Sequence, residues 1–167
     1  MKIAQIAVFL LVVLVILGFV AYSYFEIENS NGQVNVSVTS STYGAQSLNI
    51  TITAIDLRSS NHSLWTNYST GGTQVDLLDY LNPHSRSFGN ISLIEGDYTM
   101  IRLNLTSAAA EVNGTTVHLN LVRNYAAVAG NFHITARSTT YFTVEFLIDG
   151  NIDMTSHTLN PEIQVLN

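Results

Sequence analysis

Apolar and polar residues alternate with a period of two through much of the chain after residue 33. The alternation recurs in seven runs, separated by clusters of Gly, Asn and Ser, at residues 34–38, 48–54, 101–105, 117–121, 132–136, 142–148 and 163–165. Such alternation, with β-branched residues throughout, is typical of half-buried strands in antiparallel sheets. The pattern predicts an all-β fold, an antiparallel β-sandwich of the immunoglobulin or transthyretin type.

Two places depart from the regular alternation. The apolar phase slips between Ala54 and Ile55, which predicts a β-bulge in that strand. Residues 75–81 (VDLLDYL) fit one or two helical turns better than a strand.

The first part of the chain has a different pattern. Residues 6–24 carry no charge, and a helix of that length extends ~28 Å at ~1.5 Å per residue, enough to cross a bilayer. Lys2 precedes this run, whereas Glu26 and Glu28 follow it, so the positive-inside rule places the N-terminus in the cytoplasm. The sequence thus predicts a single-pass cell-membrane protein with an N-terminal transmembrane α-helix and an extracellular domain.

The expected organisation is a transmembrane anchor over residues 1–27, a short linker over 28–32 and the β-sandwich over 33–167. Two other interpretations of the N-terminus remain open. Residues 21–23 (Ala-Tyr-Ser) satisfy the small-x-small rule of a cleaved signal peptide. Ala4-Gln5, just before the apolar run, is similar to an archaeal prepilin cleavage site.

Composition narrows the possible partners. Lys2 is the only lysine, so the rest of the chain has five Arg against twelve Asp and Glu, which leaves it a formal charge of −7. This balance argues against a nucleic-acid partner. Because the chain has no cysteine, neither disulfides nor thiolate-bound zinc are expected.

Seven Asn-x-Ser/Thr sequons are present, more than chance predicts. Those on strands fall mostly on the polar phase, and the others fall in loop-like stretches, so a glycan could project into solvent. We therefore expect N-glycosylation at Asn35, Asn49, Asn61, Asn67, Asn90, Asn104 and Asn113.

The sequence contains little that indicates catalysis or metal binding. Its five histidines stand singly, without metal-ligand spacing, at His62, His84, His118, His133 and His157. Residues 149–153 (DGNID) resemble the start of a calcium loop, but Met154 stands where glycine is needed and Asn160 where glutamate is needed, which favours a turn. We expect no cofactor and no metal.

Two pairs of acids invite a glycosidase hypothesis, Asp76 with Asp79 and Glu95 with Asp97. Spacing alone does not support it, and residues 95–97 (EGD) are better interpreted as a hairpin turn. Trp65 and Tyr68 are better interpreted as a core edge or loop anchor than as a sugar-stacking platform. An extracellular carbohydrate-active enzyme is therefore the weakest hypothesis, and no catalytic residue is assigned.

Several segments together resemble the exported family catalogued as domain of unknown function 4382. They are residues 36–55, Trp65, Val75-Asp76-Leu77-Leu78, the strand Gly96-x-Tyr98-x-x-Ile101-Arg102-Leu103, residues 112–114 and Leu159-x-Pro161. The resemblance covers residues 33–167 and implies a β-sandwich on bacterial and archaeal cell surfaces, with no established reaction. Within it, Tyr98 is expected to pack in the core, Arg102 to face outward, and Pro161 to lead into a final edge strand.

The function that these observations favour is that of a membrane-anchored, N-glycosylated cell-surface protein with a structural or protein-interaction role and no catalysis. Its expected partners are the lipid bilayer and either other envelope or membrane-complex proteins or copies of itself. The alternative is a subunit of an extracellular, pilus-like filament. In that case the N-terminal helix packs in the filament core, or an edge strand is donated to a neighbour.

Overall fold

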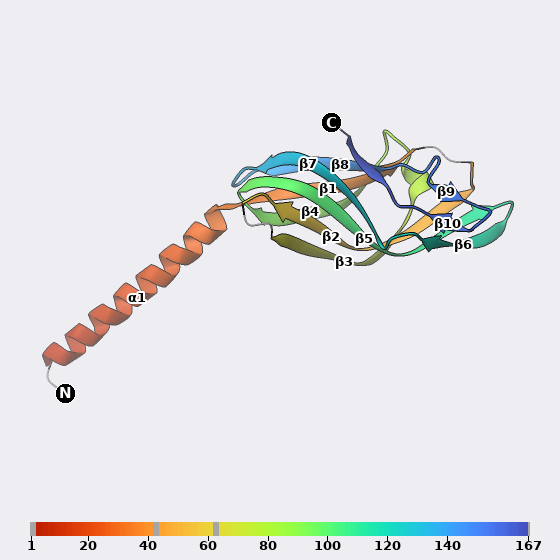
Figure 1. Ribbon diagram of the computed structural model, residues 1–167. Coiled ribbons are helices and arrows are strands. Elements are labelled where there is room, and N and C mark those ends of the chain that lie inside the picture. The colour runs from red at the N-terminus through yellow and green to blue at the C-terminus, as the bar shows by residue number, and fades with distance from the viewer. Residues whose placement is uncertain (1–2, 42–43, 62–63, 167) are drawn as a thin grey trace.

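The protein consists of one long helix and a β-sandwich. The computed structural model describes residues 3–41, 44–61 and 64–166, and within the helix it describes the side chains of residues 9–25. The helix, α1 (Ile3–Asn29), projects away from one end of the sandwich (Figure 1). Two sheets form the sandwich, so the predicted all-β fold is confirmed. Its assignment to the immunoglobulin or transthyretin type stays a prediction.

One sheet has four strands in the order β11-β8-β1-β4. These strands are β1 (Asn31–Ser40), β4 (Arg86–Ile94), β8 (Thr139–Phe146) and β11 (Ile163–Leu166). Strand β1 pairs with β4 on one side and with β8 on the other. The strand that follows α1 is therefore an inner strand of this sheet. Its inward residues Val34, Val36 and Val38 are fully buried.

The second sheet has seven strands in the described part of the chain. They are β2 (Ser47–Ser59), β3 (Trp65–Asp76), β5 (Gly96–Val112), β6 (Thr115–Leu121), β7 (Tyr125–Ile134), β9 (Ile152–Asp153) and β10 (Thr158–Leu159). The long strand β5 pairs with β2 along one side and with β7 and then β6 along the other. Strand β5 is therefore the central strand that connects β2 and β3 with β6 and β7.

The strand pairing differs from the prediction in two respects. Strands β1 and β8 are parallel, as are β10 and β6, so the sandwich is mixed rather than purely antiparallel. Residues 95–97 do not form a hairpin turn, because β4 and β5 belong to different sheets. Gly96 has a φ of 148°, a conformation that suits glycine, and the chain crosses here from one sheet to the other.

Each of the seven alternating runs coincides with a strand, although the runs 132–136 and 142–148 extend two residues beyond β7 and β8. Most of their apolar residues form the core between the sheets. The predicted bulge is confirmed, because β2 shifts register between Ile52 and Ala54 against both of its neighbours. Residues 77–80 form a single 3-10 turn, η1 (Leu77–Tyr80). The alternation did not predict β3 and β4. Most of their side chains are exposed, so the two strands carry little apolar pattern.

The predicted membrane location is wrong. A membrane-spanning helix needs about 20 consecutive residues that are predominantly apolar. In the described part of the chain, no helix combines the length and the apolarity that a bilayer span requires. The single-pass location, with a cytoplasmic N-terminus and an extracellular domain, is therefore corrected. Lys2, on which the predicted orientation depended, lies outside the described residues.

Candidate interaction surfaces

The first candidate surface is α1 itself. Its described side chains are almost all apolar and mostly solvent-exposed, and the large ones include Phe9, Leu14, Phe19, Tyr24 and Phe25. They point to all sides of the helix rather than to one face. A helix that is hydrophobic all round is normally buried, so the exposure of α1 makes it a candidate interaction surface.

The junction between α1 and the sandwich is short. Only Ser30 separates the end of α1 from the start of β1. The backbone carbonyl of Ser30 accepts a 2.8 Å hydrogen bond from the N–H of Glu95, and the carbonyl of Asn31 accepts one of 2.9 Å from the N–H of Arg137. These hydrogen bonds hold the start of β1 against residues 95 and 137, so the segment from which α1 leaves the sandwich is anchored to it.

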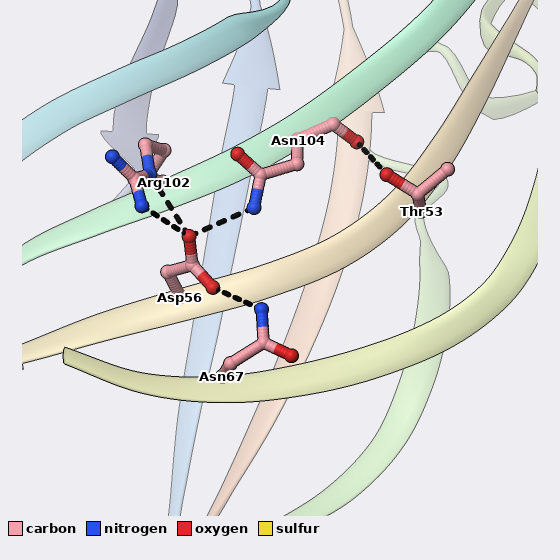
Figure 2. A network of polar contacts seen from close by, with 5 residues as sticks. All are labelled: Thr53, Asp56, Asn67, Arg102 and Asn104. Atoms are coloured by element: carbon pink, nitrogen blue, oxygen red, sulfur yellow. Dashed lines mark hydrogen bonds and ion pairs between the residues drawn. The ribbon is translucent and has the colours of Figure 1, made fainter.

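The second candidate surface is the outer face of the seven-stranded sheet, where a buried carboxylate joins three strands (Figure 2). Oδ2 of Asp56 on β2 accepts hydrogen bonds from Nε and Nη2 of Arg102 on β5, at 2.9 and 2.6 Å, and from Nδ2 of Asn104, at 2.8 Å. Oδ1 accepts a 2.6 Å hydrogen bond from Nδ2 of Asn67 on β3. Four donors therefore saturate the Asp56 carboxylate.

The electrostatics of Asp56 favour a structural role. Burial alone would raise its pKa, but the hydrogen bonds from Asn104, Arg102 and Asn67 and the charge of Arg102 outweigh burial and hold the pKa below the usual Asp value. The carboxylate is thus ionised at neutral pH and already paired. A fully paired, ionised carboxylate is poorly suited to act as a general base, so this cluster is best understood as a clamp across β3, β2 and β5.

Aromatic side chains cover the cation of this clamp. The guanidinium carbon of Arg102 lies 4.4 Å from the ring centroid of Trp65 and 5.8 Å from that of Tyr125. Arg123 lies 5.9 Å from the Tyr125 ring on the same face. Trp65 therefore packs against an arginine on the outer face of the sheet, which differs from the predicted core edge. Tyr68, in contrast, does pack at the edge of the core.

The Asp56 clamp predicts a loss of stability in acid. Because the pKa of folded Asp56 lies below its unfolded value of about 3.9, ionised Asp56 stabilises the fold above that pH, and this contribution disappears as the pH falls through the folded pKa. We expect the difference in unfolding free energy between wild type and Asp56→Asn to be constant above about pH 5 and to shrink below about pH 4. Urea unfolding followed at a series of pH values measures this difference, and one that stays constant down to about pH 2 would contradict the assignment.

The acid pairs of the glycosidase hypothesis do not form a site in the described residues. Oδ1 of Asp76 accepts hydrogen bonds from the N–H groups of Leu48 and Leu78, so it caps η1 and ties it to β2. Asp79, Glu95 and Asp97 are exposed. These acids do not converge on one buried pair, and sequence spacing alone made them look related.

One histidine, His133, and the calcium-like segment have local partners. Nδ1 of His133 lies 2.8 Å from Oδ1 of Asp97, and both side chains are exposed. Asp153 accepts hydrogen bonds from Ser156 and from the N–H of Thr155, which lower its pKa and hold the turn after β9. In the part of the chain described, three or more potential metal ligands do not cluster. His62 lies outside the described residues.

The seven sequon asparagines occupy two kinds of position. Asn61 and Asn113 are exposed in turns, and Asn113 has a φ of 52° between β5 and β6. The side chains of the others hydrogen-bond to neighbouring side chains: Asn35 with Asn90, Asn49 with Ser47, and Asn67 and Asn104 with Asp56. Occupation of any of the seven by a glycan stays a prediction.

Comparison with known proteins gives a family. The structure is similar to the crystal structure of a putative cell adhesion protein from Bacteroides fragilis, with a TM-score of 0.39 and 12% sequence identity over 83% of this chain and 46% of that chain. At this level of similarity the match carries no functional argument. No curated protein matches the sequence. The model of the domain of unknown function DUF4382 matches residues 31–161, most of the chain. The chain therefore belongs to the DUF4382 family.

Proposed function

We propose that the protein is a non-catalytic structural subunit that assembles with copies of itself through α1, in a pilus-like filament that displays the sandwich on its outer surface. The observation that carries this proposal is the exposed apolar surface of α1, which surrounds the helix and projects from the sandwich on a one-residue junction. Glycans at the exposed turns of Asn61 and Asn113, if the sequons are used, would fit such a display.

The choice of partner follows from the geometry of α1. A groove on a single partner would cover one face of the helix and leave the others in water. Several parallel helices of the same length can surround α1 completely, and copies of this chain supply them. In the structure α1 projects away from its own sandwich (Figure 1), so we expect the cover to come from other chains.

Donation of an edge strand, the other form of filament predicted from the sequence, is less favoured. Glycines with positive φ interrupt two of the edge strands: Gly71 (69°) and Gly72 (77°) in β3, and Gly89 (85°) in β4. Such distortions twist or bulge an edge away from regular pairing. These two edges therefore offer a poorer template for a neighbour than α1 does, and the strands at the other ends of the two sheets, β9 and β11, are only two and four residues long.

A single charge in the middle of α1 tests the proposal. We expect the full-length wild-type chain to form large assemblies, and Leu14→Lys to weaken association by at least about 100-fold, because a charge buried among apolar helices is strongly unfavourable. Sedimentation velocity and electron microscopy measure the change.

The matched control is Val122→Lys, which places the same charge at an exposed apolar residue that follows β6. It is expected to assemble like the wild type. A wild-type chain that stays monomeric, or a Leu14→Lys variant that assembles normally, would refute the proposal.

A further inference from the structure

A polar hollow lies between the edge strands of the two sheets, β3 and β4. Its volume is about 210 Å³, and it is lined by Tyr68, Ser69, Thr70 and Thr73 of β3 and by residues 86–88 (Arg-Ser-Phe) of β4. The side chains of Tyr68 and Phe88 pack against the core, whereas Ser69, Arg86 and Ser87 are exposed. The hollow is therefore backed by packed aromatic side chains and opens to solvent.

A bulge in each of the two edge strands lies at this hollow. Strand β3 places three residues, 70–72, opposite one residue of β2, and β4 places two residues, 88–89, opposite one residue of β1. Gly71, Gly72 and Gly89 supply the positive φ angles of these bulges. Bulges are common at sheet edges and next to binding sites, where they redirect side chains. Here both bulges help to set which side chains line the hollow.

Arg86 brings a positive charge to the hollow. Its Nη1 donates a 3.2 Å hydrogen bond to the hydroxyl oxygen of Tyr80, and its guanidinium carbon lies 6.0 Å from the centroid of the Tyr80 ring. In the part of the chain that the structure describes, Arg86 forms no ion pair. A guanidinium group binds a carboxylate through two parallel hydrogen bonds. Arg86 is therefore available to a carboxylate from outside the chain.

The hydroxyl groups of the hollow favour a ligand that donates hydrogen bonds. Thr70, Thr73 and Ser87 each donate their own hydroxyl hydrogen within the protein, to the carbonyl of Ile52, the carbonyl of Thr70 and Oδ1 of Asn35, respectively. A hydroxyl oxygen has two lone pairs, so these three oxygens can still accept a hydrogen bond. A sulfate ion has no hydrogen to donate to them, whereas a ligand with hydroxyl groups does.

We propose that this hollow binds an acidic sugar residue of a glycan, a hydroxylated six-membered ring that carries a carboxylate. The carboxylate pairs with Arg86, and hydroxyl groups of the sugar donate to the side-chain oxygens of Thr70, Thr73 and Ser87. A cavity of about 150 Å³ accommodates a benzene molecule, so a hollow of about 210 Å³ has room for one sugar ring. The rest of the glycan continues into solvent through the open side.

Saturation-transfer NMR of the full-length chain tests this inference, because it observes the signals of a small probe and tolerates a large assembly. The probes are methyl β-D-glucuronide and its neutral match, methyl β-D-glucoside, with sulfate as a competitor. We expect the glucuronide to bind with a Kd of about 1 mM. The glucoside and sulfate are expected to bind at least about tenfold more weakly, because each can make only one of the two sets of contacts.

Two arginine variants locate the binding site. Arg86→Gln is expected to weaken glucuronide binding at least about tenfold, because the charge-assisted hydrogen bonds are lost. The matched control, Arg137→Gln, removes the same charge from an exposed residue outside the hollow and is expected to bind like the wild type. Because both arginines are exposed, thermal unfolding is expected to show that both variants fold like the wild type.

Three results would overturn the inference. They are a wild-type chain that binds no glucuronide, a wild-type chain that binds the glucoside as tightly as the glucuronide, and equal glucuronide binding by the two arginine variants. Sulfate that binds as tightly as the glucuronide would show a simple anion site and refute the assignment to a sugar. None of these measurements depends on α1 or on assembly, so the proposed function stands or fails separately.

Discussion

Replacing Asp56 with alanine is expected to lower the free energy of unfolding by about 3 kcal/mol, at the lower end of the range for breaking a buried ion pair. The side chain of Asp56 is 4% exposed and accepts hydrogen bonds from residues on two neighbouring strands. Its removal leaves the amides of Asn67 and Asn104 without their acceptor. Arg102 is 32% exposed and can recover some hydration, which limits the loss.

Chemical denaturation of Asp56→Ala and Asp97→Ala measures the effect against a matched control. Asp97 also pairs with a basic side chain, His133, but both are exposed, so its removal is expected to cost about 0–1 kcal/mol. The Asp56→Ala and Arg102→Ala changes should also be strongly non-additive when combined. Equal effects of the two Asp variants would show that the clamp contributes no more than a surface pair.

Replacing Gly32 with alanine is expected to destabilise the fold by about 1–3 kcal/mol, through overpacking. A Cβ at this position would lie 2.3 Å from the carbonyl oxygen of Thr135 and 2.7 Å from Cγ2 of Ile134. The Thr135 oxygen belongs to the backbone and cannot rotate away. The adjacent hydrogen bonds between Arg137 and Asn31 and between Gln33 and Ser138 resist separation of the two segments.

Gly130→Ala is the control for this second substitution. Its Cβ would meet only the side chain of Val165, at 3.9 Å, which is an ordinary contact. Thermal and urea unfolding should therefore show a lower free energy of unfolding for Gly32→Ala than for Gly130→Ala, which should be close to the wild type. If Gly32→Ala is as stable as Gly130→Ala, the close approach of β1 to residues 134–135 is not a constraint on the fold.

The strands that the sequence predicted are those that bury one face. In β1, β2 and β5 the apolar residues alternate because one side of each strand meets the opposite sheet, and this pattern is visible without a structure. The parallel pairing of β1 with β8 was not predictable in this way. It joins segments about 100 residues apart, and alternation indicates which residues face inward without indicating which strand lies alongside.

The Asp56 clamp was only partly visible in the sequence. Arg102 was expected to face outward between the buried Ile101 and Leu103, and it does. Asp56 was overlooked, although it is the acidic residue on the polar phase of β2 after the bulge. Only the register, which sets Asp56 opposite Arg102 and Asn67, brings these side chains together. Asn67 and Asn104 each begin a sequon, so the sequence suggested that they carry glycans. It did not indicate that both side-chain amides donate to the Asp56 carboxylate.

The position of β1 has a mechanical consequence. Tension applied through α1 enters the sandwich at Asn31 and runs along β1, which extends from the helix end of the molecule between β4 and β8 (Figure 1). The paired residues of β1 and β8, from Gln33 with Thr139 to Ser40 with Phe146, then carry this load together. The hydrogen bonds between these strands lie across the direction of the pull. A pull along β1 therefore strains them together, instead of separating the pairs one after another. A pull on α1 against the rest of the sandwich thus loads the pairing of β1 with β8 in shear, along the strands.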